Sequence, residues 1–241
     1  MFLAWNDYRH IFVSTKVCLG RDHLGIAALG RGEFKTARDY FELQLKEAKE
    51  TGIKDSEGEA YLNLGNAYQS LGEFKRAFEL YQMALSFAKK IGNKDAEGAA
   101  YVNLGNAYLF LGEFKKALEL YQIGLSIFKD TGNDFEGAAY VDFGNAYRCL
   151  GEFKKALELY QMGLSIAKET GNKDVEGQAY VSLGSVYSSA GEFKKALALY
   201  QMGLSIAKET GNRDSEGTAY GNHILFSHLE QNVRSEGGVG G

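Results

Sequence analysis

The sequence lacks a run of apolar residues long enough to cross a membrane, and it lacks a block of charges of one sign. A membrane-spanning helix needs about 20 predominantly apolar residues, whereas here the mean hydropathy is -0.28 and 24% of the residues are charged. Lysine and arginine together number 27, aspartate and glutamate 31, and the net charge is -4. We therefore predict no membrane insertion and no basic surface for nucleic acid.

Cysteine and histidine are scarce, and proline is absent. The two cysteines, Cys18 and Cys149, lie far apart, no Asn-x-Ser/Thr glycosylation site occurs, and the first residues (MFLAWNDYRH) make a poor secretory signal. The four histidines are not spaced as a zinc site requires, and no phosphate-binding loop is present. These absences predict a reduced, cytoplasmic protein that is not an enzyme and needs no cofactor and no metal.

The chain is dominated by one unit that repeats. The tetrapeptide GEFK recurs at intervals of 40, 40, 39 and 40 residues, beginning at Gly32, Gly72, Gly112, Gly151 and Gly191. A fixed period of this length is typical of repeat architectures. The short interval arises because the linker TGNDFEG (131–137) has one residue fewer than TGNKDVEG (170–177). A deletion in a connection is expected to cost little.

Each unit contains two amphipathic helical patterns. In the first, helix A, one side carries Tyr61, Leu64, Gly65, Tyr68 and Leu71. The second, helix B, has two neighbouring apolar stripes: Phe74, Ala77, Phe78, Tyr81, Leu85 and Ala88 form one, and Leu80, Met83 and Phe87 form the other. Because a single pair of helices leaves one stripe exposed, we expect the pairs to stack into an all-α solenoid.

The connections carry helix stop and start signals. Gly72 follows helix A, and Glu73 is expected in the first turn of helix B, where a negative charge suits the helix dipole. Asp95 is predicted to cap the start of the next helix A. Glycines within the helices, such as Gly65 and Gly124, predict a close approach of neighbouring backbones, since glycine otherwise costs a helix about 1 kcal/mol.

The pattern resembles a known repeat family. Tyr61-x-x-Leu64-Gly65-x-x-Tyr68 followed by Ala77-x-x-x-Tyr81 is similar to the tetratricopeptide signature, with Tyr replacing Trp and Phe. The resemblance covers roughly residues 18–220. The 40-residue, proline-free unit departs from the usual 34-residue unit and looks like the Leu-Gly-Asn (Pins-like) type, similar also to kinesin light chains and to the arrays typified by tetratricopeptide repeat protein 28.

The resemblance implies an all-α, right-handed superhelical α-solenoid in which the A helices line a concave groove that contacts ligands. It also divides the chain into repeats with atypical ends. The expected segments are 1–17, an N-terminal cap or degenerate segment; 18–57, a degenerate first repeat; 58–97, 98–136, 137–176 and 177–216, repeats 2 to 5; 217–230, a partial helix or C-terminal cap; and 231–241, a flexible tail.

The remaining arc of helix A is predicted to face the groove. In the second repeat its members are Glu59, Leu62, Asn63, Asn66, Gln69 and Ser70. Stacking turns the arc into an apolar row, Leu62, Val102, Val141 and Val181, and two polar rows, one of Asn63, Asn103, Asp142 and Ser182 and one of Asn66, Asn106, Asn145 and Ser185. An apolar patch and one cation are expected at the groove edge: Leu109, Phe110 and Arg148.

These positions have alternative interpretations. Asparagine both donates and accepts hydrogen bonds, which suits a peptide backbone. Asn63 and Asn103 are equally consistent with contact to a ligand and contact to the neighbouring repeat, whereas for Asn66, Asn106 and Asn145, near the middle of the arc, ligand contact is favoured over contact to the neighbouring repeat. Leu109 and Phe110 alternatively pack on an adjacent helix, and Arg148 is alternatively solvated.

The predicted function is a non-catalytic scaffold or adaptor that binds a peptide segment of a partner protein in the groove. The alternative is a sensing or regulatory tetratricopeptide fragment of a larger multidomain signalling protein. RNA binding is disfavoured because the predicted groove rows are monotonous and carry little positive charge. Self-association is a further expectation, because nearly identical units can stack end to end.

Overall fold

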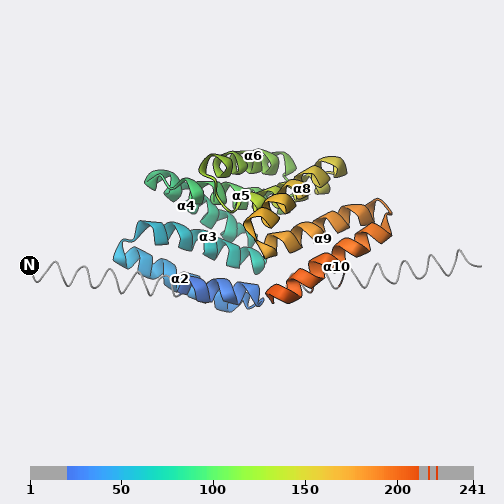
Figure 1. Cartoon of the computed structure of the whole chain (residues 1–241). Helices are drawn as coiled ribbons and strands as arrows, with labels where there is room; N and C mark the ends of the chain where they lie inside the picture. The colour runs from blue at the N-terminus through green and yellow to red at the C-terminus, as the bar shows by residue number, and fades with distance from the viewer. Residues whose placement is uncertain (1–20, 212–216, 218–220, 222–241) are drawn as a thin grey trace, which may run out of the picture. The chain divides into compact units, whose positions relative to one another are not determined.

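The computed structural model of the chain describes residues 21–211 and the single residues 217 and 221. All regular structure in this part is helical: residues 21–30 form a helical segment, and nine helices follow it (Figure 1). The nine are α2 (Phe34–Thr51), α3 (Lys54–Ser70), α4 (Phe74–Ile91), α5 (Lys94–Phe110), α6 (Phe114–Thr131), α7 (Glu136–Cys149), α8 (Phe153–Thr170), α9 (Lys173–Ser189) and α10 (Phe193–Thr210).

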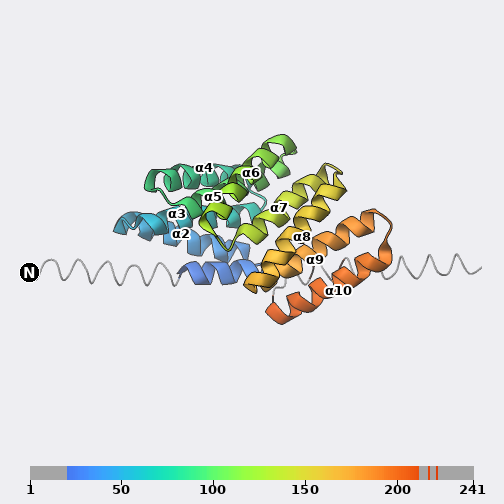
Figure 2. The same cartoon turned by 45° about the horizontal axis from the view of Figure 1, so that its top comes forward.

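The described helices form two compact units, which divide between Thr131 and Gly132. In the first unit α3 packs against α2 and α4, and α5 packs against α4 and α6. In the second unit α8 packs against α7 and α9, and α10 packs against α9. The A helices also contact each other directly, α3 with α5 and α7 with α9, so they form the inner layer of each unit (Figures 1 and 2). The predicted all-α repeat solenoid is confirmed within each unit.

A glycine in the left-handed conformation separates helix A from helix B. At the end of α3, Gly72 has φ of 77°, and the amide of Glu73 donates to the carbonyl of Tyr68 at 2.8 Å. This bond satisfies a carbonyl that the last turn of the helix leaves open. A Cβ on Gly72 meets nothing within 4 Å, so the backbone angle and not space requires glycine here.

The starts of α5 and α9 are capped by asparagine, and that of α5 is not capped by the predicted aspartate. Gly92 ends α4 with φ of 75°, and the side chain of Asn93 accepts a hydrogen bond from the amide of Ala96 at 3.0 Å. Asp95 lies one residue inside α5, so its prediction as the cap was wrong, although its charge still lies in the favourable first turn. Asn172 caps α9 in the same way.

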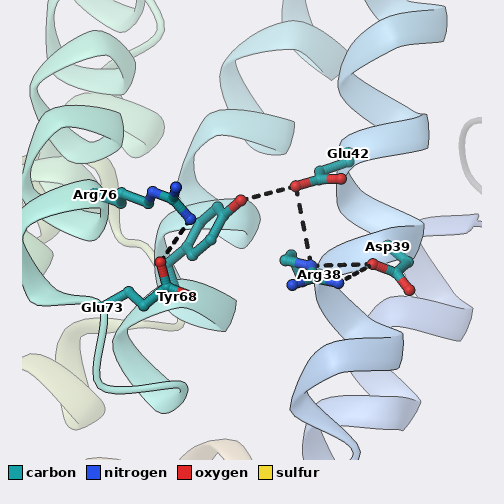
Figure 3. Close-up of polar contacts among 6 residues, drawn as sticks. All are labelled: Arg38, Asp39, Glu42, Tyr68, Glu73 and Arg76. Atoms are coloured by element: carbon teal, nitrogen blue, oxygen red, sulfur yellow. Dashed lines mark hydrogen bonds and ion pairs between the residues drawn. The ribbon is translucent and has the colours of Figure 1, made fainter.

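The prediction for Glu73 was also wrong by one residue. Glu73 is the N-cap residue of α4 and makes no capping bond; its carboxylate instead pairs with Arg76 at 2.6 Å. Arg76 lies 5.4 Å from the ring centroid of Tyr68, whose hydroxyl donates to Glu42 of α2 at 2.8 Å (Figure 3). Burial, and then Glu42, raise the pKa of Tyr68. These charged side chains therefore cover aromatic rings and join helices.

Similar cation–ring contacts connect successive hairpins. The ammonium groups of Lys49, Lys89 and Lys168 lie 5.1, 5.0 and 5.2 Å from the ring centroids of Tyr61, Tyr101 and Tyr180. Each lysine is near the end of one helix B, and each tyrosine is in the following helix A. Such contacts contribute about 0.5–1 kcal/mol at exposed sites.

The one-residue deletion shortens a helix. Helix α7 begins at Glu136 and has 14 residues, whereas α5 and α9 have 17. In α5 and α9 the first turn contains a lysine that pairs with a glutamate three residues on, Lys94 with Glu97 at 2.8 Å and Lys173 with Glu176 at 2.9 Å. Helix α7 has no such turn and begins after Phe135, which is 60% exposed. The deletion therefore removes the first turn of a helix A, and it does so where the two units divide.

Candidate functional site on the A helices

A buried tyrosine from each of four B helices reaches across to its own helix A. Tyr81, Tyr121, Tyr160 and Tyr200 are all buried. The ring of Tyr81 lies against Gly65, where an added Cβ would be 2.4 Å from Cε1 of the ring. Gly105, Gly144 and Gly184 face the other three rings in the same way. The close approach predicted for these glycines is therefore with an aromatic ring, not with a backbone.

The predicted approach of backbones does occur at the glycines of helix B. A Cβ on Gly124 would be 3.0 Å from the carbonyl oxygen of Gly98, and one on Gly163 would be 2.8 Å from that of Gly137. The 2.8 Å distance is shorter than real Cβ contacts and the 3.0 Å distance is tighter than most of them, so α6 and α8 pass close to the backbones of α5 and α7 at these points.

The tyrosine hydroxyls reach the second polar row. Tyr81, Tyr121 and Tyr160 donate to Oδ1 of Asn66, Asn106 and Asn145 at 2.8, 2.6 and 2.8 Å. The Tyr200 hydroxyl reaches Oγ of Ser185 at the longer distance of 3.4 Å. Each asparagine thus satisfies a hydroxyl of its own hairpin, a role that the sequence interpretation did not include.

The first hairpin, made of the helical segment 21–30 and α2, shows how the sequence could have revealed that the asparagines accept from tyrosine. Gly25 faces the ring of Phe41, with an added Cβ 2.4 Å from Cε1, so Phe41 occupies the place of the tyrosine. The residue after Gly25 is Ile26, not asparagine, and it is exposed. The asparagine is therefore missing in the hairpin whose ring has no hydroxyl.

The bond to tyrosine orients the asparagine amide. Because Oδ1 accepts from the hydroxyl, the Nδ2 group with its two donors lies on the other branch of the side chain. Asn66 and Asn145 are partly exposed, and no partner of their Nδ2 atoms is found in the part of the chain that the structure describes. These two residues thus combine a satisfied acceptor with available donors.

The apolar row does not face a groove. Leu62, Val102 and Val141 are 9%, 7% and 0% exposed, so the prediction that they line the ligand surface was wrong. These side chains pack onto small residues of helix B: Cγ2 of Val102 would be 2.7 Å from a Cβ on Gly124, and Leu62 shares a core cluster with Ala84. Val181 packs on Gly203 in the same way and is partly exposed.

The residues of the first polar row differ in their environments. Nδ2 of Asn63 donates to Oδ1 of Asp22 at 2.6 Å, across 41 residues of sequence, so Asn63 makes the contact with the neighbouring repeat. Ser182 is buried. Asn103 is partly exposed, and its role as a ligand contact stays a prediction.

Phe110 is the most exposed of the predicted contact residues. Its side chain is 61% exposed, and its ring stacks on Phe74 of α4 with centroids 5.0 Å apart. The expected alternative, packing on an adjacent helix, is thus observed together with exposure. Leu109 is partly exposed. The positions equivalent to Phe110 in α3 and α9 are Ser70 and Ser189, so the fold does not depend on an aromatic ring here.

Arg148 lies beside the Tyr160 hydroxyl. Burial raises the pKa of Tyr160 to about 12, while the charge of Arg148 and its hydrogen bond to the phenol oppose this rise. Arg148 is partly exposed, so it is neither fully solvated nor withdrawn from the surface. Its contact with a ligand carboxylate stays a prediction.

Residues 21–211 were compared with the requirements of a metal site and of a membrane-spanning helix. No group of three or more His, Cys, Asp or Glu side chains there is arranged to hold a metal ion. None of the helices described for this stretch combines the length and the apolar character that spanning a membrane requires.

Comparison with known proteins gives one family and several similar folds. The family model of the tetratricopeptide repeat matches residues 21–90, 56–130 and 135–209. No curated protein matches the sequence. These matches leave the 40-residue Leu-Gly-Asn type and the similarity to tetratricopeptide repeat protein 28 as predictions.

Three solved structures illustrate the similarity of fold. BtubC (BKLC) from P. vanneervenii has a TM-score of 0.59 and 20% identity, over 85% of this chain and 92% of that one. A putative kinesin light chain from Podosopora anserina has a TM-score of 0.55 and 20% identity, over 80% and 95%. A Rap protein complexed with Competence and Sporulation Factor has a TM-score of 0.64 and 14% identity, over 90% and 64%. At these identities the likeness concerns the fold alone.

Proposed function

The chain belongs to the tetratricopeptide repeat family, and from this premise we propose that it is a non-catalytic scaffold whose A-helix face binds an extended segment of a partner protein. The observation that carries the proposal is the fixed orientation of Asn66 and Asn145. Their oxygens are held by tyrosine hydroxyls, which directs two amide donors of each residue away from the hairpin interior.

Such donors suit the carbonyl groups of a peptide backbone. A backbone carbonyl occurs in every residue, so such amide donors bind a chain without demanding a particular side chain. The tyrosine bond fixes the asparagine before binding, so less side-chain freedom is lost in the complex. Selectivity then falls to the residues that vary between hairpins, such as Phe110 and Arg148.

The proposal is tested by exchanging the donor for an acceptor. In the double variant Asn66→Asp, Asn145→Asp, one carboxylate oxygen still accepts from tyrosine, while the other replaces Nδ2 and repels a peptide carbonyl. The matched control adds the same two charges on exposed residues of the B helices, Ser86→Asp and Ser165→Asp. Random dodecapeptides are selected on the full chain, and the affinities of the selected peptides are measured by fluorescence anisotropy.

We expect the asparagine variant to bind the selected peptides at least about tenfold more weakly, and the serine control to bind as the parent chain does. Circular dichroism of both variants checks that the helices persist. Equal affinities for the asparagine variant and the control would remove these donors from the proposal.

The similar Rap structure is complexed with Competence and Sporulation Factor, and a fold of this kind with a bound factor agrees with a binding role here. The wider role as a sensing or regulatory fragment of a larger signalling protein, the cytoplasmic location and self-association stay predictions.

A further inference from the structure

An acceptor-rich cluster lies at one end of the first unit. The carboxylate of Asp22 accepts from Nδ2 of Asn63 at 2.6 Å and is hydrogen-bonded by the side chain of Gln44. Gln44 is only 1% exposed, and its Oε1 has no hydrogen-bond partner in the part of the chain that the structure describes. A buried carbonyl oxygen without a donor destabilises the folded state, so its presence beside a carboxylate needs a reason.

The cluster also carries negative charge that its described neighbours compensate only in part. Burial raises the pKa of Asp22, and the nearby His23 offsets this only in part. Burial, then Asp22 and Asp55, raise the pKa of Glu59. Neither Asp22 nor Glu59 has an ion pair with a lysine or arginine among residues 21–211. The two carboxylates thus repel each other, and within residues 21–211 only the nearby His23 offsets the charge of Asp22 in part.

The fold does not require this cluster. The residues equivalent to Glu59 in the later hairpins are Ala99, Ala138 and Gln178. Those equivalent to Gln44 are Ala84, Gly124, Gly163 and Gly203. The same hairpins therefore form without the carboxylate and without the buried amide, which points to binding and not to packing as the reason for both.

We infer that Asp22, Glu59 and Gln44 receive the ammonium or guanidinium group of a lysine or arginine in the bound partner segment. Ammonium and guanidinium supply three and five donors and no acceptor, which is the complement of this cluster. Glu59, Asn63 and Asn66 follow one another at i, i+4 and i+7 on one face of α3, so the cluster continues the proposed peptide surface. The inference therefore rests on the proposed function and specifies the chemistry of its ligand.

The test couples one change in the protein to one change in the peptide. Dodecapeptides selected on the full chain are resynthesised with each lysine replaced by norleucine or each arginine by citrulline. Affinities are measured for the parent chain and for the variants Glu59→Ala and Gln44→Ala, both of which copy residues found in other hairpins. The control Glu79→Ala removes the same charge from an exposed position of α4, where α10 already carries Ala198.

We expect the selected peptides to contain a basic residue whose replacement weakens binding about tenfold. Glu59→Ala should weaken binding of the unmodified peptide by a similar factor and should not further weaken binding of the norleucine or citrulline peptide. Glu79→Ala should change the affinity of neither peptide. Added salt should weaken binding to the parent chain more than binding to Glu59→Ala.

Two results would overturn the inference in different ways. In the first, the affinity of the peptides falls in the Asn66 and Asn145 variant but changes neither with Glu59→Ala nor with replacement of their own basic residues. This result would leave the proposed function standing and refute the cation site. If no peptide is enriched over an unrelated protein, the proposed function and this inference both fail.

Discussion

The first hairpin differs from the three that follow it at two linked positions. Hairpins α3–α4, α5–α6 and α7–α8 combine glycine, asparagine and tyrosine, whereas the first combines Gly25, Ile26 and Phe41. Glycine is present with either ring, but asparagine is present only where the ring has a hydroxyl. The comparison separates two causes: the glycine provides space for the ring, and the asparagine satisfies the hydroxyl.

The largest disruption should come from filling the space for the ring. In Gly144→Ala the new Cβ would lie 2.5 Å from Cε1 of Tyr160, so the buried ring has to shift. We expect the free energy of unfolding of this unit to fall by about 1–3 kcal/mol, seen as a lower urea midpoint by circular dichroism. Gly30→Ala is the control, because its Cβ meets nothing within 4 Å and alanine favours a helix.

Removing the asparagine that accepts from tyrosine should lower the free energy of unfolding less than filling the space for the ring. In Asn106→Ala the buried hydroxyl of Tyr121 loses the bond that it donates at 2.6 Å, which should cost about 1–2 kcal/mol. Tyr121→Phe should cost less, because the partly exposed Asn106 can turn to water. The double variant should recover part of the loss in urea unfolding. Strictly additive losses would show that the pair is not coupled.

High pH should destabilise a hairpin with a buried tyrosine more than the hairpin with phenylalanine. The pKa of Tyr160 is about 12 in the folded chain, against 10.0 as its ordinary value. Because the folded pKa is the higher one, its stabilising contribution is complete below pH 10 and is lost between pH 10 and 12. Tyr160→Phe, which imitates Phe41, should reduce the fall in thermal midpoint over this range. An unchanged fall would assign it to other groups.

The smallest effect should come from improving the weakest pair. Tyr200 reaches Ser185 at only 3.4 Å, and Ser185→Asn would supply the acceptor used in the three preceding hairpins. We expect a gain of about 0.5–1 kcal/mol in the free energy of unfolding, measured in urea. A loss would mean that α9 has no room for the longer side chain.

Much of the fold follows from sequence periodicity, because the spacing of apolar residues and of GEFK fixes the helix pairs. The prediction that the apolar row faces the groove was wrong because it used the angular positions of residues on helix A but not the size of the facing residues on helix B. Small residues at Ala84 and Gly124 on helix B leave room for Leu62 and Val102, which therefore turn inward. The sequence contains those small residues, so their effect was predictable.

Other features needed coordinates. The deletion at residues 131–137 marks a changed connection, but whether the lost residue shortens the linker or the helix depends on where Asn133 and Phe135 form their hydrogen bonds. Likewise, the buried and unpartnered oxygen of Gln44 depends on how the surrounding side chains pack, which periodicity does not give. Asn66 and Asn106 lie on A helices and are partly exposed, and their contact with a ligand stays a prediction, whereas their bonds to tyrosine were missed.

The pairing of asparagine with tyrosine also restricts the mutational routes by which one hairpin can change into another. To pass from Asn and Tyr to Ile and Phe, a chain has to make two substitutions. If isoleucine comes first, the intermediate buries a hydroxyl without an acceptor; if phenylalanine comes first, the intermediate only leaves a partly exposed amide facing water. A duplicated repeat is therefore expected to keep a side chain with an acceptor oxygen for as long as it keeps the tyrosine hydroxyl, as Ser185 does for Tyr200.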